Sequence, residues 1–323
     1  IFVFVKQLKF MFNGKALYQP QGRSGEYSQW AINFFNGCTG GCEYCYNKRF
    51  PVLSAPKPTL KACFEGDQDK ALQIACKEIQ EHKDEIIRDG GVFLSFVSDP
   101  CLPETISMTY TIIEYCSVPY QIELMKPISP DNFPKTNSEL DNIAIPVTIL
   151  TKQTDWILKH DIPEYKNIWN YIWRDHCGFN KHVAFGFTLT GHDELEPGCS
   201  GNADRIKAMK VLHDRGYRTW ASIEPIIDFC SSLEMIRACA PFCDHFKVGI
   251  RTDRKFTCTE EEVVNFVNDI RKAVWGTGST VYFKRSFRDL VGGGYIIGSN
   301  FVEEGYNIFS GKGPDFEKIF NSK

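Results

Sequence analysis

Three cysteines stand close together in the first part of the chain. Cys38, Cys42 and Cys45 are separated by three and then two residues, and three glycines lie in the same stretch. Thiolates are soft ligands that suit zinc or an iron–sulfur cluster, and glycines let a loop fold tightly around a compact group. Structural zinc takes four ligands, and no fourth Cys or His stands nearby in the sequence. Three thiolates on a [4Fe–4S] cluster leave one iron free for chemistry. A zinc site completed from elsewhere and reduced core cysteines are the alternatives.

The spacing of these cysteines, with Tyr44 directly before the last one, resembles the signature of the radical S-adenosylmethionine (SAM) superfamily. The resemblance covers most of the chain from Leu17 onward. It implies that Cys38, Cys42 and Cys45 hold a [4Fe–4S] cluster, whose open iron binds the amino and carboxylate groups of SAM. Reductive cleavage of SAM then yields a 5′-deoxyadenosyl radical that abstracts hydrogen from a substrate. A flavodoxin- or ferredoxin-type protein is the expected reductant.

Several shorter motifs resemble the spore photoproduct lyase-like branch of that superfamily and related phage proteins. They are a leader at residues 22–27 that ends in Gly-Glu-Tyr, Ser98-Asp99-Pro100, Leu150-Thr151-Lys152, Phe187-Thr188, and Glu196-Pro197 followed by Arg205. In the lyases, a cysteine two residues before the Ser-Asp pair is implicated in returning hydrogen to the product radical. Phe96 holds that position here, with Cys101 as the nearby alternative thiol. We therefore expect hydrogen abstraction from another, unidentified substrate, and the residue that returns hydrogen is unknown.

The chain between these motifs alternates between strand-like and helix-like segments. Apolar, β-branched or aromatic runs predict strands at 30–35, 92–97, 147–150, 183–189, 218–223, 246–250 and 280–283. Helical periodicity predicts helices at 69–88, 104–116, 165–175, 203–215, 232–240 and 260–274. The alternation implies parallel βαβ units, and hence an α/β fold that forms a partial (β/α)6-type TIM barrel. We place the barrel at residues 28–290, with an N-terminal extension (1–27), a C-terminal extension (291–323) and a proline-rich insertion or lid at 118–145.

The active site of such a barrel lies at the carboxyl ends of its strands. We therefore expect one mouth formed by Cys45, Asp99, Lys152, Thr188, Glu224 and Arg251. Asp99, with Ser98, can accept hydrogen bonds from the SAM ammonium, and Lys152 can pair with its carboxylate. Thr188 suits a ribose hydroxyl or the carboxylate, and the backbone near Tyr44 can bracket adenine. The alternatives are a solvated turn acid for Asp99, a surface lysine for Lys152 and an ordinary strand residue for Thr188.

Glu224 stands between isoleucines at a strand end. Burial of an unpaired carboxylate there is costly, so Glu224 needs a partner. It either meets a ligand or pairs with an arginine such as Arg251. Two basic groups, at residues 251–255 and 284–288, follow predicted strands and make nucleic acid or a nucleotide one candidate substrate class. A solvated charged surface is the commoner explanation of both groups.

The composition sets broader limits. The 323 residues carry 37 basic and 40 acidic side chains, a net charge of −3, so no overall basic field attracts nucleic acid or a membrane. The 13 cysteines cannot all pair, which favours reduced thiols and a cytoplasmic location. No segment is long and apolar enough to span a bilayer, and Met11 is a plausible true start of the chain.

The other cysteines leave one question and one alternative function open. Cys230, Cys239, Cys243 and Cys258 could hold an auxiliary cluster, although buried free thiols explain them better. Cys199 and the remaining cysteines are scattered and receive no role, and the seven histidines show no ligand spacing. The alternative to an enzyme is a non-catalytic zinc- or iron–sulfur-binding interaction protein in which the cysteine loop is structural.

Overall fold

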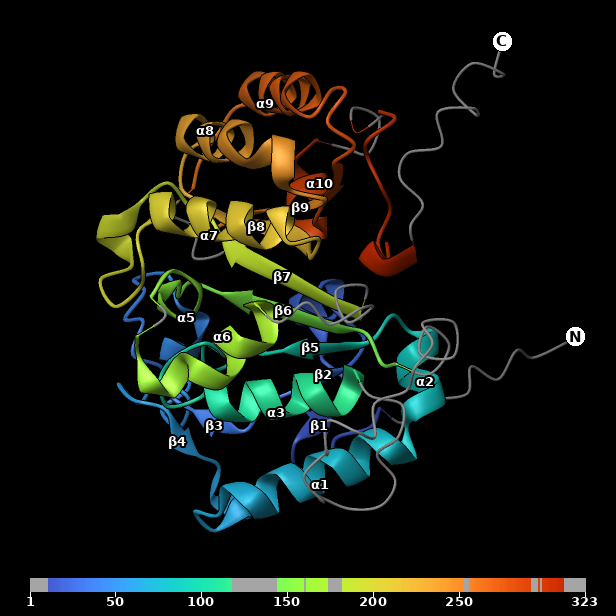
Figure 1. Cartoon of the computed structure of the whole chain (residues 1–323). Helices are drawn as coiled ribbons and strands as arrows, with labels where there is room; N and C mark the ends of the chain where they lie inside the picture. The colour runs from blue at the N-terminus through green and yellow to red at the C-terminus, as the bar shows by residue number, and fades with distance from the viewer. Residues whose placement is uncertain are drawn as a thin grey trace, which may run out of the picture.

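The computed structural model describes residues 11–117, 144–159, 161–173, 182–251, 256–291, 296 and 298–310. Its centre is a sheet of eight strands, whose order in Figure 1 follows the chain. The strands are β1 (Leu17–Tyr18), β2 (Ala31–Ile32), β5 (Val92–Leu94), β6 (Val147–Thr151), β7 (Val183–Thr188), β8 (Arg218–Ile226), β9 (His245–Ile250) and β10 (Thr280–Phe283). β1 is antiparallel to β2, and the others run parallel. This confirms the predicted α/β class, while the (β/α)6 barrel stays a prediction.

Helices connect the parallel strands. They are α1 (Gln68–Glu81), α2 (Lys83–Arg88), α3 (Ile106–Ser117), α5 (Asp155–Leu158), α6 (Lys166–Trp173), α7 (Asn202–Asp214), α8 (Phe229–Cys239), α9 (Glu260–Ala273) and α10 (Arg285–Val291). Short 3-10 helices occupy Gly22–Glu26, Tyr46–Arg49, Ala62–Phe64, Pro163–Tyr165, Asp193–Leu195, Ala240–Phe242 and Ile308–Ser310. Consecutive helices touch one another, as α7 touches α8 and α8 touches α9, so they cover one face of the sheet.

The side chains of β7 show how the sheet separates two cores. Val183, Phe185 and Phe187 belong to the large core under the helices. Ala184 belongs to a smaller cluster on the opposite face, which we call the inner face, as alternation along a strand requires. Gly186 faces the same side, because a Cβ at this position would lie 2.1 Å from the Trp220 ring. The glycine therefore lets the indole cross the inner face.

Local signals in the sequence explain where the elements end, and two predicted elements prove to be divided. Thr259 and Glu262 form the reciprocal bonds of a capping box at the start of α9. Gly216 has a φ of +80° just after α7. The predicted helix at 69–88 is two helices, because His82 leaves the helical conformation. The predicted strand at 30–35 is divided because the Asn33 amide bonds to the Ala16 carbonyl instead of to the β5 ladder.

Some predicted segments lie outside the described residues, among them residues 1–10, 118–143 of the predicted lid, and 311–323. The division into a barrel with two extensions stays a prediction. No helix in the described part of the chain is long and apolar enough to cross a membrane.

Candidate functional site

The cysteine loop starts directly after β3 (Phe35–Asn36), which pairs with β4 (Thr59–Leu60) in a small second sheet. The Cys38 amide donates to the Ala55 carbonyl at 3.0 Å. Gly37 has a φ of +82°, and a Cβ there would lie 2.3 Å from the Lys57 carbonyl oxygen, so only glycine fits. The Ser98 hydroxyl, which is buried, donates to the Gly37 carbonyl at 2.5 Å. Both β4 and the loop after β5 therefore hold the cysteine loop in place.

The sulfur atoms gather around Gly40. Its amide donates to Cys38 Sγ at 3.4 Å. A Cβ at Gly40 would lie 3.5 Å from Cys38 Sγ, 3.6 Å from Cys42 Sγ and 3.1 Å from Cys199 Sγ. The absence of a side chain at Gly40 thus lets three sulfurs lie close to its backbone. Cys45 follows, and its amide donates to the Cys42 carbonyl at 3.2 Å.

This donor set fits an iron–sulfur cluster. Within the described ranges, no three His, Cys, Asp or Glu side chains are grouped closely enough to hold a single metal ion. A zinc ion needs its ligands at about 2.0–2.3 Å, whereas a [4Fe–4S] cluster spreads its thiolates over separate irons. The soft ligands and the Gly40 amide directed at Cys38 Sγ therefore suit the larger group.

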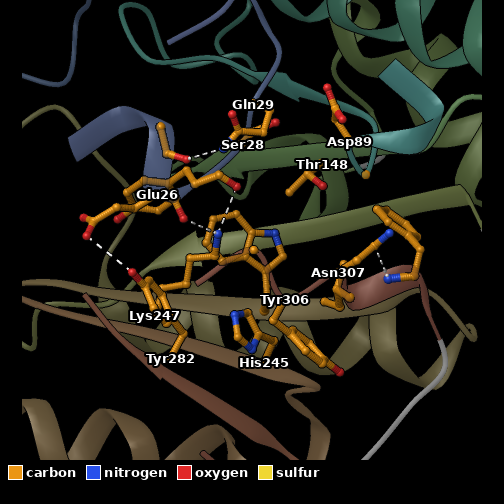
Figure 2. Close-up of a pocket in the computed structure, with 17 residues that line it drawn as sticks. Glu26, Ser28, Gln29, Asp89, Thr148, His245, Lys247, Tyr282, Tyr306 and Asn307 are labelled. Carbon is orange, nitrogen blue, oxygen red and sulfur yellow. Dashed lines mark hydrogen bonds between the residues drawn. The ribbon is translucent and has the colours of Figure 1, made fainter. Parts of the chain in front are cut away.

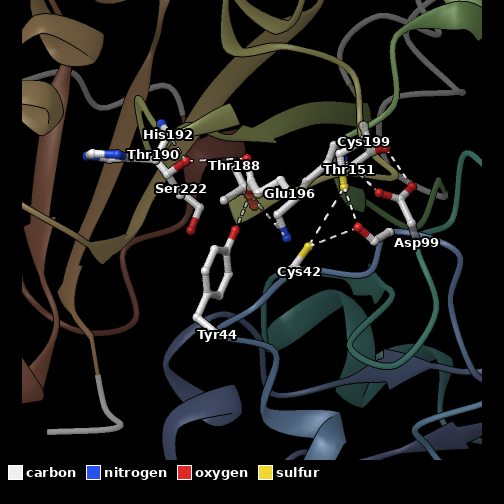
Figure 3. Close-up of polar contacts among 12 residues, drawn as sticks. Cys42, Tyr44, Asp99, Thr151, Thr188, Thr190, His192, Glu196, Cys199 and Ser222 are labelled. Carbon is white, nitrogen blue, oxygen red and sulfur yellow. Dashed lines mark hydrogen bonds and ion pairs between the residues drawn. The ribbon is translucent and has the colours of Figure 1, made fainter. Parts of the chain in front are cut away.

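Cys199, for which the sequence analysis predicts no role, belongs to this site. Its Sγ lies 3.8 Å from Cys42 Sγ, although the two residues are 157 positions apart (Figure 3). The contact with Cys199 is the main reason that the pKa of Cys42 is lowered, to about 6, and it raises the pKa of Cys199. No spacing signal marks Cys199, because the fold and not a short loop brings it to Cys42.

A buried ion pair lies beside the sulfurs. Arg205 Nη1 and Glu196 Oε2 are 2.7 Å apart, and both side chains are fully buried. The Tyr44 hydroxyl donates to the other oxygen of Glu196 (Figure 3). Arg205 also donates to the carbonyls of Thr188 and Ser200, each at 2.8 Å. The pairing of Glu196 with Arg205 thus ties the end of β7 to the cysteine loop.

Lys152 places a cation beside this loop. Its Nζ lies 4.0 Å from Glu196 Oε1 and 5.5 Å from the centre of the Tyr44 ring. Burial alone disfavours its charge, but Tyr44, Cys42 and Glu196 together raise the pKa of Lys152 well above its ordinary value. Because the side chain keeps 21% of its exposure, a permanent positive charge stands at the rim of the site.

Both carboxylate oxygens of Asp99 accept hydrogen bonds from other residues of the chain. Oδ1 accepts from the Thr151 hydroxyl at 2.6 Å and the Cys101 amide at 3.0 Å, and Oδ2 accepts from the Lys152 amide at 2.7 Å. These bonds join the loop after β5 to the end of β6. The role of Asp99 toward the SAM ammonium stays a prediction.

Thr188 is buried at the end of β7, and its register partner in β8 is Ser222. Two residues further along β8, Glu224 accepts from Lys284 Nζ at 2.6 Å and from the Tyr27 hydroxyl at 2.5 Å. The ion pair of Glu224 is therefore with Lys284 rather than with the predicted Arg251. Tyr27 belongs to the leader segment and also contacts Ser222 at 2.7 Å, so the leader packs against these strand ends.

The basic group at 284–288 is largely neutralised. Lys284 is buried and also lies 3.5 Å from Glu26. Arg285 pairs with Glu304, and Arg288 pairs with Glu303, both at 2.7 Å. These pairs remove most of the free charge that would attract phosphates. Residues 254 and 255 of the other basic group lie outside the described residues.

A separate cavity opens near the starts of the strands, at the edge opposite to the cysteine loop (Figure 2). Thr148, Trp220 and His245 line it from the beginnings of β6, β8 and β9. Lys247 lies in its wall, and burial, with help from Lys284, lowers the pKa of Lys247 to about 7. None of the residues expected to contact SAM lines this cavity, but Tyr27, which bonds to Glu224, does.

The other cysteines do not extend the site. Cys101 is buried in the core under the helices, whereas Phe96 packs on the inner face, so Cys101 does not replace the missing thiol there. Cys239 and Cys243 are buried and donate to backbone carbonyls. Cys230 is exposed. The proposed auxiliary cluster receives no support from these contacts.

The described part of the chain thus combines a mostly parallel α/β sheet with a three-cysteine loop between β3 and β4 and with Lys152 directly after β6. Solved structures to which the chain is similar are of spore photoproduct lyase. One, complexed with dinucleoside spore photoproduct, has a TM-score of 0.54 and 17% identity over 82% of this chain and 80% of that chain. Another, a double variant with bound AdoMet and dinucleoside spore photoproduct, has a TM-score of 0.52 and 15% identity over 82% and 78%.

A tyrosine-to-phenylalanine variant of the same lyase has a TM-score of 0.44 and 14% identity, and the chain covers 62% of its length. No protein-family model and no curated protein sequence matches the chain. At these identities the two better matches support only the fold, an α/β structure with a mostly parallel sheet.

Proposed function

We propose that the chain is a radical SAM enzyme in which Cys38, Cys42 and Cys45 hold a [4Fe–4S] cluster. When bound, the cluster supplies the electron that splits SAM into methionine and a 5′-deoxyadenosyl radical. The observation that carries the proposal is the convergence of the cysteine loop and Lys152 at the carboxyl edge of the sheet. There, a permanent cation stands beside soft ligands.

The residues at successive strand ends divide the work of binding SAM. Lys152, at the end of β6, offers its ammonium to the SAM carboxylate, and Asp99 and Ser98 hold the adjoining loop, with Asp99 also facing the SAM ammonium. Thr188, at the end of β7, offers a hydroxyl to the ribose or the carboxylate. The backbone near Tyr44 borders the adenine. Glu224 lies one strand further on.

We propose a substrate other than a thymine photoproduct. Spore photoproduct lyase binds a dinucleoside spore photoproduct, but Phe96 stands here where the lyases place the cysteine that returns hydrogen. The paired state of Lys284, Arg285 and Arg288 weakens one of the two arguments for nucleic acid. A flavodoxin- or ferredoxin-type protein in the cytoplasm is the proposed electron donor.

The decisive experiment is purification without oxygen, followed by reduction with dithionite in the presence of SAM. We expect brown protein that forms 5′-deoxyadenosine, measured by liquid chromatography and mass spectrometry. Cys42→Ala should remove the chromophore and the product while the circular dichroism spectrum stays that of a folded protein. Colourless wild-type protein with one tightly held zinc would instead support the structural alternative.

A further inference from the structure

The position of Cys199 beside Cys42 is fixed by the backbone. The Gly198 amide donates to the Gly40 carbonyl at 3.1 Å, and the Glu43 amide donates to the Leu195 carbonyl at 2.9 Å. A Cβ at Gly198 would lie 2.0 Å from the Thr39 carbonyl oxygen. The loop after β7 and the cysteine loop are therefore interlocked, which holds Cys199 beside Cys42, and their sulfurs lie 3.8 Å apart.

This distance suits a hydrogen bond better than a second iron ligand. Each iron of a [4Fe–4S] cluster takes one cysteine thiolate, and two sulfurs 3.8 Å apart are too close to serve two different irons. The Cys199 thiol has one proton and two acceptors in reach, the Gly40 carbonyl at 3.6 Å and Cys42 Sγ at 3.8 Å. Once Cys42 is a thiolate ligand, its negative charge makes it the stronger acceptor.

The arrangement also completes a pattern among the cluster cysteines. Cys38 Sγ already receives a hydrogen bond from the Gly40 amide at 3.4 Å. Cys42 Sγ has Cys199 as its nearest sulfur partner (Figure 3). Each of these two sulfurs therefore has its own donor, one from the backbone and one from a side chain.

On the basis of the proposed function, we propose that the Cys199 thiol donates a hydrogen bond to the Cys42 thiolate of the cluster and thereby raises the reduction potential of the cluster. Reduction adds one negative charge to the cluster and its ligands. A hydrogen bond to a ligand sulfur stabilises the more negative state, and such bonds are among the factors that set iron–sulfur potentials. Cys199 thus acts through Cys42 as a positioning residue and does not touch the substrate.

The test compares full-length wild-type protein with Cys199→Ala and Cys199→Ser after anaerobic reconstitution. Cys116→Ala is the control, because Cys116 is buried in the core under the helices. Iron and sulfide content are measured first, and then the midpoint potential is measured by redox titration with electron paramagnetic resonance, without SAM. We expect full iron content in all four proteins, a more negative potential in Cys199→Ala, and a potential at or near the wild-type value in Cys199→Ser and Cys116→Ala.

Two results would overturn the inference. An unchanged potential in Cys199→Ala would show that the thiol does not act on the cluster. Iron loss in Cys199→Ala as complete as in Cys42→Ala would identify Cys199 as a ligand. Wild-type protein without an iron–sulfur cluster would contradict the proposed function itself, and iron analysis separates that outcome from the other two.

Discussion

Replacement of Arg205 by methionine tests the buried ion pair that joins β7 to the cysteine loop. Methionine keeps much of the volume of the side chain but removes its charge and its donors. Arg205 and Glu196 are both fully buried and lie 2.7 Å apart. The change therefore leaves the Glu196 carboxylate without its closest cation.

The structure sets the size of the effect. Removal of one partner of a buried ion pair costs about 3–5 kcal/mol. The carbonyls of Thr188 and Ser200 also lose a donor, at about 1–3 kcal/mol for each group left unsatisfied. Lys152, 4.0 Å from Glu196, keeps a second cation nearby and reduces the loss. We expect a total of about 5 kcal/mol, at the low end of these contributions because Lys152 remains nearby, which is a large part of an ordinary stability of about 5–15 kcal/mol.

The assay is urea unfolding followed by circular dichroism. Lys210→Met is the matched control, since Lys210 lies on the same helix and pairs with Asp214 at 2.6 Å while more than half exposed. An exposed pair of this kind is worth about 0–1 kcal/mol. The double variant Arg205→Met/Glu196→Gln should be more stable than Arg205→Met, because the unpaired charge is gone. If Arg205→Met costs no more than Lys210→Met, the assigned role of the pair is wrong.

Three further predictions follow from single contacts. Lys152→Ala should weaken SAM binding, measured by equilibrium dialysis, without loss of the brown chromophore; unchanged affinity would remove Lys152 from the site. Gly198→Ala should lower iron content in a folded protein, because its Cβ would meet the Thr39 carbonyl at 2.0 Å. The pKa of Lys247 is about 7 in the folded protein and ordinary in the unfolded chain, which therefore binds more protons above pH 7. Wild-type stability should then gain up to about 1.4 kcal/mol per pH unit over Lys247→Met between pH 7 and 10, and parallel urea curves for the two proteins would contradict this.

The strands were predictable because their burial leaves a clear pattern. All residues of β7 are buried. A run of apolar and β-branched residues predicts such a strand even when the neighbouring strands are unknown. Boundaries were less predictable. The break at His82 and the division of the strand at 30–35 depend on contacts with Phe12 and Ala16, which come from another part of the chain.

The partner of Glu224 shows why site contacts are harder to predict than site membership. The sequence indicates that the carboxylate at this strand end either meets a ligand or pairs with an arginine such as Arg251, whereas the structure pairs it with Lys284. Position in space decides between them. The Lys284 amide bonds to the Val248 carbonyl, and its ammonium lies 4.2 Å from the centre of the Tyr27 ring. Tyr27 itself bonds to Glu224, so the leader segment helps to bring the two charges together.

Cys199 marks the limit of spacing as a signal. Cys38, Cys42 and Cys45 are recognisable because one short loop must bring them to a single metal centre. Their spacing in the sequence therefore indicates their chemistry. Cys199 lies beside Cys42 only because β7 runs parallel to β6 and the loop after β7 contacts the cysteine loop. Nothing in the residues beside Cys199 separates it from Cys116, which fills space in the core. What distinguishes the two is the 3.8 Å between sulfurs, and a measured reduction potential can report on that contact.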